Sequence, residues 1–318
     1  MTARVTMRHR VVYLFARVGL LVTNALPERL AYGLAGGLGR LFFRCSKRRQ
    51  RLAMKMLRHA FPDGKTDAEL FRLGSLGTVN LFKVAVDMVR MIPWVNSGRL
   101  AERFDFAEMN GYPDPPFIGV TGHFGSWEIG AIATAMLRGE AHLIAREFKN
   151  PLIQQMLLSC RQRAGVNVHP KRGGMRPVVR GLAEGCVAMQ AADQRQRQRG
   201  VRVPFFGEIA STDRSAAVLA LRKGYPIAIA GAERVGPGFR FRGLLVEIIE
   251  VESTGDHEAD VARVTAEVNR GLERLILRRP EQYLWIHDRY RKSSSATQQD
   301  PQPAADPRPL SEEARGVQ

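Results

Sequence analysis

Cysteines and long uninterrupted apolar runs are scarce in this sequence of 318 residues. The three cysteines, Cys45, Cys160 and Cys186, have neither the paired spacing of a disulfide framework nor that of a zinc motif. We therefore expect buried thiols, a reducing compartment and no metal site. The apolar stretch at residues 11–26 is broken by Arg17 and lacks a small-x-small cleavage site, so we interpret it as retained rather than as a cleaved signal peptide.

The same stretch is short for a helix that spans a membrane. As a helix it would reach roughly 24 Å, whereas the hydrocarbon core of a bilayer is ~30 Å thick. A spacing of seven places Arg10, Arg17 and Asn24 on one polar stripe of an otherwise apolar helix. This pattern favours an interfacial helix that lies in the membrane surface. A tilted single pass, with Arg17 reaching the interface, is the alternative.

Acidic residues are nearly absent from the N-terminal part of the chain. Residues 1–60 hold thirteen Lys or Arg and the single acid Glu28, which places +12 of the net charge of +17 there. A charge of this size requires an acidic partner. Apolar runs at residues 11–15 and 41–43 interrupt the basic residues, which is atypical of a tail that binds nucleic acid. We expect residues 1–60 to be a basic amphipathic segment that associates with anionic membrane lipids, and no nucleic-acid partner.

Beyond residue 116, short apolar runs alternate with helical patterns. We expect strands at residues 117–121, 142–146, 166–169, 186–192, 227–230 and 244–251, and helices at residues 129–137, 152–163, 176–183, 215–223 and 260–277. This alternation predicts an α/β fold, with a mostly parallel central sheet flanked by helices and with N-terminal membrane-associating helices. Residues 61–292 would form the sheet domain. Residues 293–318, rich in Ser, Gln, Pro and Ala and without aromatic residues, are predicted to be disordered.

The most informative motif is GHFGSWE at residues 122–128. Glycines on either side of His123 permit an unusual backbone path at the end of a strand, and Ser126 can cap the helix that follows. His123 then lies at the carboxyl edge of the sheet, where such folds bind ligands. Glu128, in the first helical turn, can accept a hydrogen bond from one imidazole nitrogen. The other nitrogen is then left to face the pocket as a base.

This pair of residues indicates direct group transfer, because no Ser or Cys lies in a nucleophile-elbow pattern. His123 would take the proton from an acceptor hydroxyl as that oxygen attacks an activated acyl carbonyl. Glu128 would stabilise the imidazolium that forms. The developing oxyanion needs hydrogen-bond donors. The candidates are the backbone N–H groups of Gly125 and Ser126, at the start of the helix, or a nearby Arg.

Several separate motifs between positions 117 and 291 resemble those of the bacterial lipid A late acyltransferases, which belong to the lysophospholipid acyltransferase superfamily. Residues 122–128 are similar to the His-x4-acid catalytic motif of that family. The other similar blocks are Arg146 with Asn150 and Pro151, Arg161, ADQ at residues 192–194, PFFG at residues 204–207 and PEQYLWIH at residues 280–287. The resemblance implies a glycerolipid acyltransferase-like fold, with His123 and Glu128 as catalytic residues.

The resemblance also implies the substrates and the location. Such enzymes move a fatty acyl chain from a thioester of acyl carrier protein or coenzyme A to a hydroxyl of a lipid A precursor or similar glycolipid, at the cytoplasmic face of the bacterial inner membrane. They use no cofactor beyond this acyl-ACP or acyl-CoA co-substrate. Asp288, at a position usually basic in the family, and Arg214, where glycine is common, depart from the pattern. The acceptor is therefore less well defined than the reaction.

Substrate-binding roles are predicted for five residues. Arg146 and Arg161 are candidate anchors for lipid phosphates or for the phosphate of the donor; solvated charges are the alternative. Asp193 ends a buried strand, where it would hold an Arg in place or accept a hydrogen bond from a sugar. A purely structural ion pair is the alternative for Asp193. Asn150 and Gln194 follow from the resemblance.

Further arginines lie near these motifs. Those of the polar loop at residues 194–202 would clamp a lipid phosphate or an acidic carrier protein, or would simply be solvated; they are Arg195, Arg197, Arg199 and Arg202. Farther along the chain we expect Trp285 and His287 to close the core, with Arg289 and Arg291 exposed beside them.

Three alternative functions remain open at this stage. The same chemistry could serve another acceptor, such as a lysophospholipid or a glycosylated phosphoinositide. The chain could be a non-catalytic basic protein that binds membranes through residues 1–60. It could also be a hydrolase in which His123 and Glu128 activate water.

Overall fold

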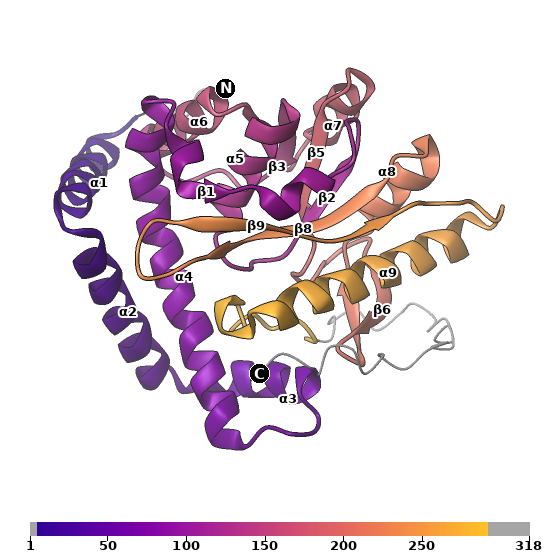
Figure 1. The fold of residues 1–318 in the computed structure, drawn as a ribbon, viewed down its shortest axis with the longest axis horizontal. Helices are drawn as coiled ribbons and strands as arrows, with labels where there is room; N and C mark the ends of the chain where they lie inside the picture. The colour runs from indigo at the N-terminus through magenta and orange to yellow at the C-terminus, as the bar shows by residue number, and fades with distance from the viewer. Residues whose placement is uncertain (1–4, 292–318) are drawn as a thin grey trace.

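A seven-stranded sheet forms the centre of the structure, a computed structural model that describes residues 5–291 (Figure 1). Its strand order is β1-β9-β8-β2-β5-β3-β4. Neighbouring strands are parallel except for β8 and β9, which are antiparallel. The strands are β1 (Phe104–Asp105), β2 (Ile118–Thr121), β3 (Ala141–Ile144), β4 (Val166–His169), β5 (Val187–Ala191), β8 (Ile227–Arg234) and β9 (Phe241–Ile249). The predicted mostly parallel sheet is confirmed.

Helices cover both faces of this sheet and bury an apolar core on each. One core includes residues of α5 and α6, and the other includes residues of α7, α8 and α9. Strand β8 serves both cores because successive side chains of a strand alternate between faces: Ile227 and Ile229 join the α9 side, whereas Ala228 and Ala230 join the α5 side. The helices are α5 (Trp127–Arg138), α6 (Pro151–Arg163), α7 (Met175–Ala183), α8 (Ser215–Lys223) and α9 (His257–Arg278).

The short strand β1 and one pair of strands were not predicted from the sequence. Each segment predicted from residue 117 onward coincides with an observed element, with ends shifted by a few residues. The stretch expected to be a loop, however, runs into an antiparallel hairpin of β6 (Val201–Phe205) and β7 (Glu208–Thr212). Its turn uses positive φ angles at Phe206 and Gly207. Val203 and Phe205 of β6 are buried and Arg202 and Pro204 are exposed, which is the period of a strand. Pro204 argues against a strand, however, because proline cannot donate a hydrogen bond to its neighbour.

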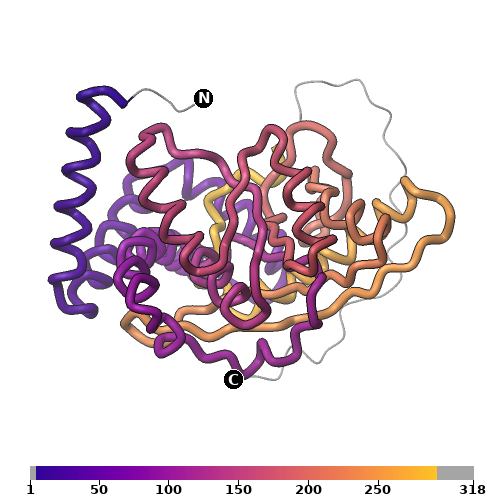
Figure 2. The backbone as a smooth tube through the Cα atoms, turned by 90° about the horizontal axis from the view of Figure 1, so that it is seen from above, coloured from indigo at the N-terminus to yellow at the C-terminus, as the bar shows by residue number. Residues whose placement is uncertain are grey.

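Four α-helices precede the sheet within residues 5–291. Helix α4 lies between the sheet and the first two helices, which form one side of the molecule (Figures 1 and 2). The helices are α1 (Met7–Ala25), α2 (Glu28–Cys45), α3 (Lys47–Ala60) and α4 (Asp67–Asn96). Three short 3-10 helices complete the described part of the chain: η1 (Leu100–Arg103), η2 (Ala107–Gly111) and η3 (Pro280–Gln282).

The outer face of α1 and α2 is apolar. Exposed large apolar side chains recur at helical spacing along both helices: Met7, Val11, Leu14, Phe15, Val18, Leu21 and Val22 on α1, and Leu30, Leu34, Leu38, Leu41 and Phe42 on α2. We call these residues the N-terminal apolar face. Within residues 5–291, no helix combines the length and apolarity needed to cross a bilayer.

The N-terminal helices are joined to the sheet domain by buried polar contacts. The hydroxyl of Tyr32 donates to Asp87 over 2.6 Å, and Arg90 donates to the carbonyls of Thr23 and Leu26. The described residues before position 60 therefore pack as part of one body with α4. The division at residue 60 stays a prediction, and the predicted disorder of residues 293–318 lies outside the described residues.

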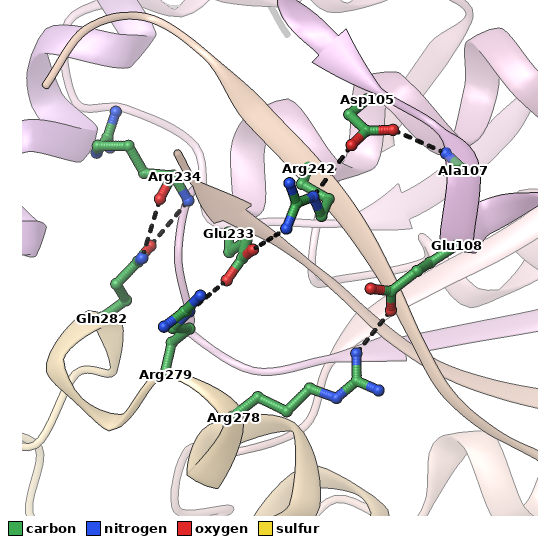
Figure 3. Close-up of polar contacts among 9 residues, drawn as sticks. All are labelled: Asp105, Ala107, Glu108, Glu233, Arg234, Arg242, Arg278, Arg279 and Gln282. Carbon is green, nitrogen blue, oxygen red and sulfur yellow. Dashed lines mark hydrogen bonds and ion pairs between the residues drawn. The ribbon is translucent and has the colours of Figure 1, made fainter. Parts of the chain in front are cut away.

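A set of polar contacts connects the end of β8 to the segment after α9 (Figure 3). Glu233, 4% exposed, accepts a hydrogen bond from Arg279 and lies 3.5 Å from Arg242. Beside it, the amide of Gln282 accepts from the backbone N–H of Arg234 over 2.8 Å and donates to its carbonyl over 3.1 Å. Residues 280–284 are thereby held against the carboxyl end of β8.

Candidate active site

The site forms where two neighbouring parallel strands end. Thr121 of β2 pairs with Ala191 of β5, so the residues that follow both strands emerge at one edge of the sheet. His123 and Asp193 each lie two positions beyond that pair. His123 Nδ1 lies 2.8 Å from Asp193 Oδ1, and the backbone N–H of His123 donates to Asp193 Oδ2 over 2.9 Å. One carboxylate thus fixes both the ring and the backbone of the histidine.

The two side chains are strongly coupled electrostatically. The side chain of His123 is 22% exposed and that of Asp193 is 2% exposed. Burial on its own would lower the pKa of His123, but the adjacent Asp193 carboxylate outweighs burial and raises that pKa above its ordinary value. Burial would raise the pKa of Asp193, but the attraction and hydrogen bonds of His123 lower it to about 2. Asp193 is therefore ionised and stabilises an imidazolium.

The hydrogen bond predicted between His123 and Glu128 was wrong. Glu128 instead forms a bidentate ion pair with Arg161 of α6, with Arg161 Nη2 2.8 Å from Glu128 Oε2 and Arg161 Nε 3.1 Å from the same oxygen. The side chains are 19% and 8% exposed, respectively. Glu128 lies in the first turn of α5, where Arg161 of α6 reaches its carboxylate. It remains near enough to contribute to the raised pKa of His123.

Gln194 and Trp127 border the free nitrogen of the imidazole. The amide nitrogen of Gln194 lies 3.1 Å from His123 Nε2. The Trp127 ring lies 4.9 Å from the imidazole ring, centroid to centroid, at a tilt of 55°. With Nδ1–H donating to Asp193, Nε2 carries the lone pair of a neutral imidazole. Among residues 5–291, the polar side chain that bonds to this nitrogen is the amide of Gln194, which can donate a hydrogen bond to it.

The loop around His123 is held by contacts with distant segments. Gly125 has φ of 55°, and a Cβ there would lie 1.9 Å from the Ala232 carbonyl oxygen, so only glycine fits. The carbonyl of Gly125 accepts from the buried side chain of Asn80. Farther along, the backbone N–H of Leu284 donates to the carbonyl of His123. The position of His123 therefore depends on α4 and on the segment after α9.

The predicted oxyanion donors are already engaged. The N–H of Gly125 donates to the carbonyl of Gln282 over 3.0 Å, and that of Ser126 donates to Ala232 over 2.8 Å. Ser126 is the N-cap residue of α5, but its buried hydroxyl forms no capping hydrogen bond and has no hydrogen-bond partner among residues 5–291. These two N–H groups are bonded within the protein and are not available to a substrate, because they attach the loop to Gln282 and to Ala232 of β8.

Two further predicted binding residues have structural contacts. Asn150 is the N-cap of α6: its oxygen accepts from the N–H of Leu152, and its amide donates to the carbonyl of His9 in α1. Arg161, expected as a phosphate anchor, is instead bound to Glu128 as described above. Arg146 is exposed beyond the carboxyl end of β3 and stays a candidate contact for a phosphate.

The expectation that Arg289 is exposed was also wrong. Its side chain is buried, 1% exposed, and donates to the carbonyls of Gln194 and Ser211. Its charge helps to lower the pKa of Asp193. His287 accepts from the backbone N–H of Arg195, and burial lowers the pKa of His287. The segment around Arg289 thus supports the residues that follow β5, a role that its sequence did not indicate.

Comparisons with known proteins identify the family of this chain. The sequence profile of the family described as "bacterial lipid A biosynthesis acyltransferase" matches residues 2–292. The chain belongs to this family. It is thus an acyltransferase that acts on lipid A or a related lipid.

Two individual proteins show more distant similarity to this acyltransferase. The lipid A biosynthesis lauroyltransferase of Escherichia coli (strain K12) is 25% identical over 273 residues, which cover 84% of this chain and 87% of that protein. Among solved structures, the 1-acyl-sn-glycerophosphate acyltransferase of Thermotoga maritima aligns with 77% of this chain and 97% of its own. That alignment has 15% sequence identity and a TM-score of 0.33.

Proposed function

We propose that this acyltransferase moves a fatty acyl chain from a thioester of acyl carrier protein or coenzyme A to a hydroxyl of a lipid A precursor or similar glycolipid, with His123 as general base. The observation that supports the base is the 2.8 Å contact between His123 Nδ1 and Asp193. It holds the tautomer in which Nε2 carries the lone pair that accepts a proton. The membership of the family supports the acyl chemistry and the class of acceptor.

The proposed reaction proceeds by direct attack. The acceptor hydroxyl gives its proton to His123 Nε2 while its oxygen forms a bond to the thioester carbonyl carbon. The resulting oxyanion expels the thiolate, which takes the proton from the imidazolium, and leaves an ester. Asp193 stabilises the imidazolium that exists between these steps. Glu128 positions α5 against α6 through Arg161, and this ion pair is its proposed contribution.

The side-chain amide of Gln194 is the proposed donor to the reacting oxygens. It already lies 3.1 Å from the base nitrogen, where both the attacking and the carbonyl oxygen must come. The loop amides of Gly125 and Ser126 are occupied, so this amide takes over the role that was first expected of them. A preorganised donor of this kind contributes about 10²–10³-fold to turnover in other acyl-transfer sites.

The N-terminal apolar face is the proposed membrane contact. Its exposed Leu, Val and Phe side chains lie on the outside of α1 and α2, and the same segment carries most of the net charge. Apolar insertion and attraction to anionic lipids act together on such a surface. We propose that the protein lies on the cytoplasmic face of the bacterial inner membrane, where donor and glycolipid meet.

An acyl-transfer assay tests the proposal. Full-length protein in mixed micelles is given an acyl-ACP or acyl-CoA donor, with and without a lipid A precursor, and products are identified by mass spectrometry. We expect the unsubstituted protein to produce an acylated glycolipid. His123→Ala should lower the rate of acyl transfer about 10³-fold or more. His59→Ala, at a histidine outside the site, serves as the control. Release of free fatty acid independent of glycolipid would establish a hydrolase instead.

A further inference from the structure

A second group of reactive side chains lies at the opposite edge of the sheet. Glu140 and Cys186 directly precede β3 and β5, and His142 is the second residue of β3. Because these strands run parallel to β2, their starts lie at the far edge from His123. One ligand atom from each of Glu140, His142 and Cys186 lies within 4.8 Å of the other two. We propose that these three residues bind a zinc ion, which joins the starts of two neighbouring strands.

The donor set matches zinc chemistry. Zinc takes thiolate sulfur, imidazole nitrogen and carboxylate oxygen in tetrahedral sites, and three protein ligands leave a fourth position for water. The thiolate disfavours Mg²⁺ and Ca²⁺, which prefer oxygen ligands. On binding, the S–H bond of Cys186 is broken, its proton leaves to solvent and a Zn–S bond forms. No oxidant or reductant is involved.

The surrounding residues orient these ligands as second-layer partners do in metal sites. His142 Nδ1 lies 3.0 Å from His169 Nε2, which leaves the Nε2 atom of His142 as the ligand atom; it lies 3.9 Å from Glu140 Oε1. The amide of Asn167 donates to the Glu140 carboxylate. Such partners fix the tautomer and direction of ligands, and their loss typically weakens metal affinity about 10–100-fold.

The backbone is built around the imidazole as well. A Cβ at Gly181 would lie 2.8 Å from His142 Nε2, so the absence of a side chain in α7 lets the ring lie against the helix. Gly185, with φ of 85°, turns the chain so that the N–H of Cys186 donates back to the Gly181 carbonyl over 2.8 Å. The spacing of the cysteines gave no indication of this site, because its ligands come from separate strands.

Cobalt substitution provides the test. Untagged full-length protein, stripped with a chelator and then dialysed, is titrated with Co²⁺, and the thiolate-to-cobalt charge-transfer band is followed. We expect one equivalent to bind, Zn²⁺ to displace it and Mg²⁺ to leave it in place. Cys186→Ser should abolish the band and Glu140→Gln, at an exposed position, should weaken binding at least tenfold. His169→Gln should weaken it about 10–100-fold.

The control is a substitution at a cysteine outside the proposed site. Cys45→Ser, at an exposed cysteine on α2, should bind like the natural chain. Zn²⁺ should also protect Cys186, and not Cys45, from alkylation, as read by mass spectrometry. Absence of the band in folded natural protein, or its persistence in Cys186→Ser, would overturn the proposal. Since Glu140→Gln removes only an exposed carboxylate, unaltered affinity in that variant would do the same.

Discussion

At the scale of single residues, Asp193 decides the state of the proposed base. Asp193→Asn removes the charge that holds the pKa of His123 above its ordinary value. Only the neutral imidazole accepts a proton, so the acidic limb of the kcat/KM profile should move to lower pH in the variant. Turnover at the optimum should fall about 10³–10⁴-fold, because the ring loses its tautomer and its counter-charge.

The measurement is a pH–rate profile of acyl transfer, with Asp67→Asn as the control. Asp67 is also an aspartate in an ion pair, but its side chain is 73% exposed and remote in function. An Asp193→Asn profile that coincides with the natural one would show that Asp193 does not set the pKa of the base.

Glu128 should behave differently from Asp193. Glu128→Gln leaves the buried guanidinium of Arg161 without a charged partner, so we expect the free energy of unfolding to fall by ~1–3 kcal/mol, less than for a fully buried pair because Glu128 is partly exposed. Turnover should fall because α5 and α6 lose the ion pair that positions them against each other. The acidic limb of the kcat/KM profile should shift less than it does in Asp193→Asn. Denaturant unfolding and the same pH–rate profile measure both.

Glu102→Gln is the matched control for that experiment. Its partner Arg99 is 61% exposed, so loss of this surface ion pair should leave the free energy of unfolding nearly unchanged. If Glu128→Gln were as stable as this control and shifted the pH profile as far as Asp193→Asn, Glu128 would act directly on the imidazole.

The sequence singled out His123 as the candidate base but did not predict Asp193 as its hydrogen-bond partner, for a physical reason. The identity of His123 rests on a local pattern, a buried strand followed by glycines. Its hydrogen-bond partner lies 70 positions away and becomes adjacent only through the pairing of β2 with β5. Asp193 also follows a buried strand, so the rule that parallel strands end at one edge could have placed the two together. The direction of Glu128 toward Arg161 depended on helix packing, which no short motif reports.

At the scale of elements, α1 and α2 are predicted to attach the protein to the bilayer. The triple variant Leu14→Ser, Phe15→Ser, Val18→Ser removes three exposed apolar side chains from α1 without touching a buried contact. Each contributes up to about 1.5–3 kcal/mol when inserted in lipid, so partition onto anionic vesicles should fall at least tenfold. A vesicle sedimentation assay at two salt concentrations measures this.

Substitution is a cleaner test than removal of residues 1–45. Removal would take Tyr32 away from Asp87, a buried carboxylate that also accepts from Arg234, and would disturb the fold. Ile248→Ser, on β9, is the control because it changes an exposed apolar residue away from α1 and α2. Equal sedimentation of the triple variant and the natural chain would place the membrane contact elsewhere.

At this scale the alternation of elements was predictable and the hairpin was not. Residues 166–169 and 215–223 have the predicted bounds because the apolar periodicity there is strong and the flanking residues end each element. The β6–β7 hairpin is stabilised by burial of Phe205 and by contacts with α9, which the local sequence does not encode. Tertiary packing therefore determines its strands.

For the whole molecule, the coupled pair predicts how stability depends on pH. The pKa of Asp193 is about 2 in the folded protein, below its ordinary 3.8. Its contribution to the free energy of unfolding is therefore present above pH 3.8 and is lost as pH falls toward 2. The difference between these two pKa values corresponds to about 2 kcal/mol of unfolding free energy. His123 has the opposite sign: its pKa is raised, so its contribution is complete below pH 6.5 and declines as pH rises through the folded pKa.

Denaturant unfolding at several pH values measures this contribution as a difference between proteins. The gap in unfolding free energy between the natural chain and Asp193→Asn should narrow by about 2 kcal/mol between pH 5 and pH 2. Asp67→Asn should show no such narrowing. A gap that stayed constant over this range would mean that Asp193 titrates normally in the folded protein.

The hydrogen bonds that fix the histidine loop have a consequence for the order in which the protein is made. His123 and Gly125 are bonded to Leu284 and Gln282, which a ribosome adds roughly 160 residues later. A nascent chain that still lacks those residues has Asp193 and Asn80 to hold the loop, but not these two hydrogen bonds. We therefore expect acyl transfer only after residues 282–284 have left the exit tunnel.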